Sequence, residues 1–311
     1  MESRIAFLFP GQGSQYVGMG LKAYQSYPFV REVFEAADDI LGFKLSSLCF
    51  YGPTESLTDT LNAQAAILTV SMAYLRVHQS STETAQPAFV AGHSMGEYTA
   101  LVAAGALSFA DGLRLVRERG RLMKEAGERN PGSMAAVIGM TVEALEAICR
   151  EASGPTEMQS VRIANYNAPG QIVISGEEQA VNRAISLAKE RGARRVVSLA
   201  VSIASHSPLM RSAADGLHTA VDAVTIKPAH VPIIANVTAR PITTPDEIRQ
   251  ELVAQLTSPV RWIESVQYMA QQGVSTFVEI GPKDVLTGLQ KRIAPEMAVI
   301  NAESEKGFAQ V

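Results

Sequence analysis

The stretch Ala88-Phe89-Val90-Ala91-Gly92-His93-Ser94-Met95-Gly96 decides the fold of this chain. Its first four residues are an apolar run, and a helix-forming segment follows from Met95 to Ala104, where Gly105 is a natural stop. A serine between two glycines at such a strand-to-helix turn exposes its hydroxyl beside the unpaired N–H groups of the helix start. The pattern favours Ser94 as a nucleophile. A chance match at a tight turn is the alternative.

The segments around this turn alternate between predicted strands and helices. Ile5–Phe9 is predicted as a short buried strand, and helices are expected at Asp59–His78 and Asp111–Ala126. Farther along, the sequence predicts a helix, a strand, a helical region broken at Pro259, a second strand and a final helix, at Ser207–Val224, Val231–Val237, Thr244–Gln272, Phe277–Ile280 and Val285–Ile293. This alternation is typical of an α/β fold with a parallel sheet covered on both sides.

The middle of the chain follows a different pattern. Strands are predicted at Met134–Met140, Val161–Asn165, Gln171–Ser175 and Arg194–Leu199, with helices at Val142–Ala152 and Glu177–Arg191. The order is βαββαβ, which is the ferredoxin-like arrangement. We therefore expect a small subdomain at residues 132–198, inserted in a larger α/β domain made of residues 1–131 and 199–311. One continuous domain is the alternative.

Composition limits the classes of function. The 311 residues carry a formal net charge of -4 with a pI near 5.8, which argues against a nucleic-acid-binding protein. The two cysteines, Cys49 and Cys149, do not suggest a disulfide framework, and the five histidines show no metal-ligand spacing. The start lacks the features of a signal peptide, and no apolar run is long enough to span a bilayer. We therefore expect a cytoplasmic protein that does not enter a membrane.

A nucleophilic serine needs a base, and His206 is the best-placed histidine. It follows a predicted strand and precedes a predicted helix, where side chains of a parallel sheet gather into sites. His93 is expected to pack inward, and the others, His78, His218 and His230, are expected on the surface. No acid occupies an obvious third position between the serine and His206, unlike in an ordinary α/β-hydrolase. A backbone carbonyl or an amide side chain must then orient the imidazole. A capping or core role is the alternative for His206.

Two further features could serve an acyl-transfer site. The turn Pro10-Gly11-Gln12-Gly13-Ser14-Gln15 lacks the Lys-Ser/Thr of a phosphate-binding loop, and we expect the N–H groups of Gln12 and Met95 to form a two-point oxyanion hole. A plain tight turn is the alternative. Arg119 lies on a predicted helix with other arginines, and one of them can face inward to offer a planar fork to a carboxylate. A solvated helix face is the alternative for each of them.

Taken together, several motifs in this order resemble the malonyl-CoA:acyl carrier protein transacylases and the related acyltransferase domains of polyketide synthases. The resemblance extends from Ile5 to about Ile293, nearly the whole chain. It depends on Phe9-Pro10-Gly11-Gln12-Gly13, Gly92-His93-Ser94-Met95-Gly96-Glu97-Tyr98, Arg119-Gly120, Asn165-Tyr166-Asn167-Ala168-Pro169-Gly170-Gln171, His206-Ser207, Asn236-Val237 and Glu279-Ile280-Gly281-Pro282.

The resemblance implies a fold and a set of residue roles. The fold would be a large α/β-hydrolase-like domain with a parallel central sheet and a ferredoxin-like insert. Ser94 would carry the acyl group, His206 would be the general base and acid, and Gln255 would orient His206. Arg119 would pair with the free carboxylate of a malonyl group. The remaining roles would be the oxyanion hole and the cleft lining, at Gln12 and Met95 and at Asn165 and Asn167 respectively.

The implied reaction is a ping-pong transfer of malonyl from coenzyme A to the phosphopantetheine thiol of an acyl carrier protein, in fatty acid or polyketide synthesis. Malonyl-CoA and the carrier protein would be the partners of a monomer, with no nucleic acid, no metal and no permanently bound cofactor. Ser205 leaves room for an α-methyl group, so methylmalonyl stays open beside malonyl. A thioesterase would use the same serine and histidine, but the missing acid and the presence of Arg119 argue against it.

The family's carrier proteins are acidic, so a basic rim near the cleft is a further expectation. Six residues could form it: Arg191, Arg194, Arg195, Lys283, Lys291 and Arg292. Scattered solvated charges are the alternative.

Overall fold

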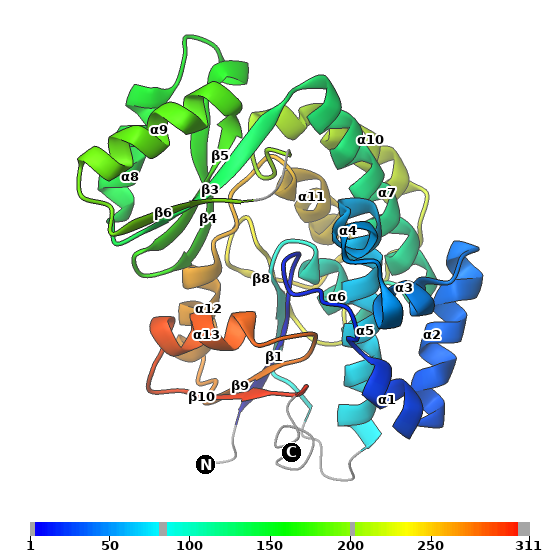
Figure 1. Cartoon of the computed structure of the whole chain (residues 1–311). Helices are drawn as coiled ribbons and strands as arrows, with labels where there is room; N and C mark the ends of the chain where they lie inside the picture. Colours follow the sequence, from blue (N-terminus) through cyan, green and yellow to red (C-terminus); the bar gives the residue numbers. More distant parts are fainter. Residues whose placement is uncertain (1–3, 81–85, 200–202, 304–311) are drawn as a thin grey trace.

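The structure is a computed structural model that describes residues 4–80, 86–199 and 203–303. Its centre is a six-stranded sheet in the order β10-β9-β1-β2-β7-β8 (Figure 1). All strand pairs are parallel except β7 with β8. The strands are β1 (Ile5–Phe9), β2 (Phe89–Gly92), β7 (Ile233–Ile234), β8 (Pro241–Ile242), β9 (Thr276–Glu279) and β10 (Ala298–Asn301).

Helices cover both faces of this sheet, and the alternation within β1 shows how. Phe7 and Phe9 point into a core built with α2, α5, α6, α7, α10 and α11, whereas Ala6 and Leu8 point into a second core with α12 and α13 (Figure 1). The helices of the large domain are α1 (Leu21–Ser26), α2 (Pro28–Leu41), α3 (Leu45–Tyr51), α4 (Thr54–Thr58), α5 (Thr60–Ser80), α6 (Gly96–Ala103), α7 (Phe109–Arg129), the 3-10 turn η2 (Pro208–Met210), α10 (Arg211–Asp222), α11 (Pro245–Gln255), α12 (Trp262–Gln271) and α13 (Val285–Ile293).

A second, four-stranded sheet is entirely antiparallel, in the order β4-β5-β3-β6. The chain order β3 (Gly132–Ile138), α8 (Val142–Ala152), η1 (Glu157–Gln159), β4 (Val161–Ala168), β5 (Gln171–Glu177), α9 (Glu178–Glu190) and β6 (Arg195–Ser198) follows the predicted βαββαβ pattern. Helices α8 and α9 pack on one face of this sheet and form a core of their own. The other face carries Met134, Ala164 and Val173 and turns toward the large domain.

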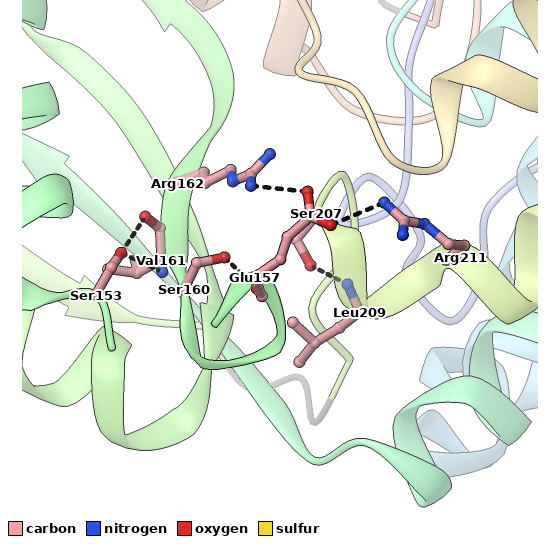
Figure 2. A network of polar contacts seen from close by, with 8 residues as sticks. All are labelled: Ser153, Glu157, Ser160, Val161, Arg162, Ser207, Leu209 and Arg211. Carbon is pink, nitrogen blue, oxygen red and sulfur yellow. Dashed lines mark hydrogen bonds and ion pairs between the residues drawn. The ribbon is translucent and has the colours of Figure 1, made fainter. Parts of the chain in front are cut away.

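Backbone hydrogen bonds join β4 of the small sheet to the loop between α11 and α12. The N–H of Val260 donates to Ala164 O at 2.8 Å, and the N–H of Tyr166 donates to Val260 O at 2.9 Å. Glu157 of η1 forms ion pairs with Arg162 of β4 and with Arg211 of α10 (Figure 2). The Nη2 atoms of the two arginines lie 3.0 and 2.9 Å from its carboxylate oxygens. Through these contacts the small sheet is attached to the α11–α12 loop and to α10.

Several predicted elements are wrong in extent. The strand expected at Val231–Val237 is only two residues long, and the helix expected at Ser207–Val224 begins as a 3-10 turn and becomes α-helical at Arg211. His78 was expected on the surface, but it is 3% exposed and packs edge-on against Phe7 at 5.0 Å between ring centroids. It lies inside because α5 is buried on nearly all sides between the sheet and α7.

Candidate active site

Ser94 sits in the turn between β2 and α6 with a left-handed backbone, at φ 52°. This conformation is strained for a residue with a side chain. Only glycine fits on either side of it: a Cβ on Gly92 would lie 1.9 Å from the carbonyl carbon of Gly96, and one on Gly96 would lie 2.2 Å from Phe9 O. The close approach of β1, β2 and α6 therefore forces the serine hydroxyl outward, as the sequence predicts.

The predicted base lies beside this hydroxyl. Ser94 Oγ is 2.8 Å from His206 Nε2, although 112 residues separate them in sequence. On the other side of the ring, Nδ1 lies 2.8 Å from Gln255 O and 3.1 Å from Ser258 O. Since both are carbonyl acceptors, Nδ1 carries the proton and Nε2 is left to accept one from the serine. Burial, and then the charge of Arg119, lower the pKa of His206 to about 3, so the imidazole is neutral and ready to act as a base.

Gln255 orients His206, as the resemblance implies, and its side chain makes separate contacts. It orients His206 through its backbone carbonyl, because it is the last residue of α11 and its carbonyl is not used within the helix. Its side chain has a different position: Nε2 donates to Ser94 O at 3.0 Å and to a carboxylate oxygen of Glu97, and Oε1 accepts from Arg119. An amide side chain therefore holds the nucleophile while the backbone of the same residue holds the base.

Arg119 faces inward from α7 and is 1% exposed. Its Nη2 donates to Ser94 Oγ at 3.1 Å and to Gln255 Oε1 at 3.0 Å, and its Nη1 donates to Gln64 Oε1 at 2.9 Å. All three acceptors are neutral, and no carboxylate within the described residues forms an ion pair with this guanidinium. Burial lowers the pKa of Arg119, yet an arginine remains charged at neutral pH. A buried cation without an anionic partner is suited to a ligand that brings a carboxylate.

These groups open into one cavity of about 400 Å³ between the two sheets. Ser94, His206 and Arg119 line it together with Met134 and Val173 of the small sheet. Every other predicted site residue except Gln255, which lies behind Ser94, also lines it: Gln12, Met95, Asn165, Asn167 and Ser205. The volume of the cavity lies in the size range of small-molecule ligand sites.

The two predicted oxyanion-hole donors belong to this cavity. Within the part of the chain that the structure describes, the N–H groups of Gln12 and Met95 make no hydrogen bond. The turn that carries Gln12 is held by its side chain, whose Oε1 accepts from Thr60 Oγ1 at 2.9 Å. Thr60 in turn accepts from Gln64 Nε2 at 3.0 Å, and Gln64 binds Arg119. The turn and the arginine are thus connected through two buried polar side chains.

Asn165 and Asn167 of the small sheet, and Ser205 next to His206, line the cavity without contacting Ser94 Oγ. Asn167 Oδ1 accepts from His93 Nε2 at 2.8 Å, and the His93 ring packs against Trp262; His93 is half-buried and lines the cavity, so the expectation that it packs inward is only partly correct. Asn165 is 5% exposed and pairs through its backbone with Val260. Ser205 lies at the cavity wall next to His206. These three residues shape the cavity and do not touch the reacting hydroxyl.

The sequence analysis gave no role to Asn236. Its Oδ1 accepts from the Ser94 N–H at 2.8 Å and its Nδ2 donates to Gly92 O at 2.7 Å, so it bridges the two peptide groups of the strained turn. It is 1% exposed. The available signal is its position near the end of the predicted strand Val231–Val237, because parallel strands place their site residues at this end.

Only some of the six residues expected to form a basic rim contact residues that line the cavity. Arg191 forms an ion pair with Glu151 on the outer side of the small sheet. Lys283 and Arg292 lie at the two ends of α13, whose Leu286 and Leu289 line the cavity. Lys283 Nζ contacts Gly13 O at 3.1 Å, and Arg292 contacts Pro169 O at 2.7 Å. Lys283 contacts Gly13 and Arg292 contacts Gln171, and both of these partners line the cavity.

The described residues contain neither a membrane-spanning helix nor a cluster of metal ligands. No helix among them is long and apolar enough to cross a membrane. No cluster of three or more His, Cys, Asp or Glu side chains in the same ranges could hold a metal ion. Both cysteines are free and buried.

Comparison with known proteins agrees with this geometry. The family model of the acyl transferase domain matches residues 6–302. The malonyl CoA-acyl carrier protein transacylase of Bacillus subtilis strain 168 is 49% identical over 298 residues, which cover 96% of this chain and 93% of that protein. The solved transacylase of Coxiella burnetii has a TM-score of 0.95 at 39% identity, covering 99% and 96% of the two chains. A malonyl-transacylase solved in complex with its type II PKS acyl-carrier protein has a TM-score of 0.95 at 40% identity, covering 99% and 98%.

Proposed function

The chain belongs to the acyl transferase domain family, and from this premise we propose that it moves a malonyl group from coenzyme A to the phosphopantetheine thiol of an acyl carrier protein through an ester on Ser94. The activity serves fatty acid or polyketide synthesis. The observation that carries the proposal is the convergence of three groups in one cavity: a hydroxyl, a neutral imidazole 2.8 Å from it, and a buried guanidinium 3.1 Å from it.

The first half-reaction forms the ester. His206 Nε2 takes the proton of Ser94 Oγ as the oxygen attacks the thioester carbonyl carbon. The free N–H groups of Gln12 and Met95 stabilise the oxyanion of the tetrahedral intermediate. The carbon–sulfur bond then breaks, and the imidazolium returns its proton to the departing sulfur of coenzyme A.

The second half-reaction reverses this chemistry with a new thiol. The phosphopantetheine thiol of the carrier protein gives its proton to His206 and attacks the Ser94 ester. The intermediate collapses with loss of the serine oxygen, which regains its proton from the imidazolium. One base serves both halves, so the cycle is a ping-pong exchange that needs no resident cofactor or metal.

Arg119 defines the class of acyl group. A carboxylate that enters the cavity loses its water, and this loss is compensated only where a cation receives it. Arg119 supplies that cation from a position next to Ser94, so a malonyl group is selected over an acetyl group. We favour malonyl over methylmalonyl. Ser205 beside His206 is small enough to leave the second substrate open.

The uncharged carbonyl partners of His206 affect how readily the Ser94 ester is hydrolysed. Carbonyl oxygens at 2.8 and 3.1 Å stabilise an imidazolium less than an aspartate would, so His206 is a mild base. Such a base suits thiols better than water and limits hydrolysis of the ester. The orienting oxygen belongs to the backbone of Gln255, so its contact with His206 does not depend on the side chain at this position.

The finer description of the fold is also a proposal. We assign residues 1–131 and 199–311 to an α/β-hydrolase-like domain and residues 132–198 to a ferredoxin-like insert. The separate antiparallel sheet, with its own core under α8 and α9, supports the division. A single copy contains every residue of the proposed site, so we expect the monomer to be active.

A transfer assay tests the proposed function. The protein is mixed with holo acyl carrier protein and, in competition, malonyl-, methylmalonyl- and acetyl-CoA, and the mass of the carrier is followed with time. We expect malonyl-carrier protein to form first, and none to form with Ser94→Ala. Release of free malonate without carrier acylation would identify a thioesterase instead and would refute the proposal.

A further inference from the structure

Two buried carboxyl groups lie behind the reactive serine, and no step of the reaction uses them. Glu97 is in the first turn of α6, three residues after Ser94, and its side chain is 0% exposed. Glu251 is in α11, four residues before Gln255, and is 6% exposed. Buried acids are costly unless hydrogen bonds or a shared proton compensate for the lost water. Their contacts show what they stabilise.

Glu97 holds both amide side chains that clamp the serine. Its Oε1 accepts from the N–H of Asn236 at 2.9 Å and from Asn236 Nδ2 at 3.2 Å, and its Oε2 accepts from Gln255 Nε2. Asn236 in turn binds the Ser94 N–H, and Gln255 binds Ser94 O. One carboxyl group therefore fixes the partners of both peptide groups of the left-handed residue.

Glu251 meets the same loop from the other helix. Its Oε1 accepts from the N–H of Val237 at 2.9 Å, one residue after Asn236. Asn236 and Val237 are consecutive, so the carboxyl groups of Glu97 and Glu251 accept from neighbouring backbone N–H groups of one loop. Burial, and then the charge of Glu251, raise the pKa of Glu97 well above its usual value, while Arg119 opposes the shift. Burial raises the pKa of Glu251 to about 7. The two acids are therefore neighbours that hold one loop and influence each other's charge.

The two helices that this pair joins carry the two halves of the catalytic contact. Helix α6 begins two residues after Ser94, and α11 ends at Gln255, whose carbonyl orients His206. We propose that Glu97 and Glu251, which hold the consecutive N–H groups of Asn236 and Val237, are positioning residues that tie α6 to α11 through this loop and thereby set the distance between Ser94 Oγ and His206 Nε2. The inference depends on the proposed roles of Ser94 and His206 but not on the identity of the acyl group.

Two replacements of Glu251 separate positioning from simple packing. Glu251→Gln keeps an oxygen that can accept from the Val237 N–H, whereas Glu251→Leu fills the space without this hydrogen bond. A displacement of the reacting groups by about 1 Å costs about 100-fold in rate. We expect Glu251→Leu to lower kcat about 30- to 100-fold with KM for malonyl-CoA changed less than about threefold, and Glu251→Gln to stay within about threefold of the parent.

A second readout needs neither malonyl-CoA nor carrier protein. The rate at which a fluorophosphonate labels Ser94 reports the reactivity of the hydroxyl alone, and we expect it to fall in parallel with kcat in Glu251→Leu. If the parent is labelled but does not transfer malonyl, the proposed function fails while the positioning role is still tested. Thr99→Val is a matched control in α6, because the buried Thr99 hydroxyl has no hydrogen-bond partner among the residues described. Its labelling rate should equal that of the parent.

Leu252→Ala tests the purely structural explanation, since Leu252 is fully buried in α11 and makes no polar contact with the pair. We expect it to lower the melting temperature without changing kcat of the folded enzyme. If Glu251→Leu does not fold, Glu251→Asp replaces it: the carboxylate of the shorter acid is drawn back from the Val237 N–H, and kcat should fall about tenfold. The inference is overturned if the folded Leu or Asp variant labels and turns over like the parent. It is also overturned if Gln loses as much activity as Leu, or if Leu252→Ala loses kcat equally.

Discussion

Replacing Arg119 with alanine should convert a selectivity for malonyl into near indifference between malonyl and acetyl groups. The guanidinium is 1% exposed and donates to three neutral oxygens, on Ser94, Gln255 and Gln64. Without it, the carboxylate of malonyl enters a buried site with no cation, where the carbonyl oxygens of Gln64 and Gln255 face it. Removing one member of a buried, hydrogen-bonded charge pair costs about 2–5 kcal/mol. That range corresponds to a loss of kcat/KM for malonyl-CoA of roughly 30-fold to several-thousand-fold.

Acetyl-CoA brings no carboxylate, so its transfer loses only the contribution of Arg119 to holding Ser94 and Gln255. The ratio of the two kcat/KM values removes that shared loss, and we expect it to fall at least about tenfold. Direct competition between the two substrates gives the ratio independently of the amount of active enzyme. Arg117→Ala is the matched control, because Arg117 lies on the same helix but binds Leu61 O at 2.8 Å and stacks over Phe43, outside the cavity. An unchanged ratio in Arg119→Ala would refute the role assigned to this residue.

Three further predictions concern the base, a buried acid and the strained turn. Because the pKa of His206 is lowered to about 3, the pH profile of fluorophosphonate labelling at Ser94 should lose its rate only below about pH 5; an acid limb near the ordinary histidine value would contradict the burial argument. Burial raises the pKa of Glu279 to about 7, although it accepts from the N–H groups of Leu286 and Thr287 at 2.9 and 2.7 Å. The folded state then binds the proton more tightly, so this contribution to stability is complete below the ordinary pKa and is lost as pH rises through about 7. In urea titrations the free energy of unfolding of Glu279→Gln should decline less between about pH 5 and 8 than that of the parent, and an identical slope would contradict this. Asn236→Ala leaves the Ser94 N–H and Gly92 O without partners, so the free energy of unfolding should fall by about 2–4 kcal/mol, and a change below about 0.5 kcal/mol would show that the turn does not depend on it.

The parts of the fold that could be predicted are those where burial leaves a pattern in a short stretch of sequence. β1 and β2 are buried on both faces, so each is a continuous apolar run. The βαββαβ order was visible because its two helices are amphipathic and its strands are bounded by turn residues. Before the predicted helix at Asp59, no element was assigned to residues 16–58, where α1 to α4 lie. Three of these helices have only five to seven residues, too few for a helical period to show.

The other errors come from contacts between distant residues. β7 lies in an apolar segment, but only Ile233 and Ile234 pair with β2, because the chain leaves the sheet to place Asn236 behind Ser94. The burial of His78 depends on Phe7, far away in sequence, and no local signal distinguishes it from an exposed histidine at a helix end.

In the active site, the sequence predicts which residues react, but it does not predict which polar groups bind one another. The glycines around Ser94 announce a strained turn, since their Cβ atoms would overlap neighbouring backbone. By contrast, the orienting group of His206 is a backbone oxygen, and a backbone oxygen has no sequence signature. The sequence leaves open whether a backbone carbonyl or an amide side chain orients His206, and in the fold the amide of Gln255 holds the serine and Arg119 instead. Only the folded chain shows which of two polar groups on one residue faces which partner.

The most direct test of the account is to find where the malonyl group resides between the two half-reactions. The protein is mixed with malonyl-CoA in the absence of carrier protein, quenched, digested and mapped by mass spectrometry, and a second portion receives holo carrier protein before the quench. The account predicts a malonyl ester on Ser94 alone, which disappears when the carrier is added and is recovered as malonyl thioester on its phosphopantetheine. Malonyl attached to another side chain, or carrier acylation by Ser94→Ala at the parent rate, would contradict it.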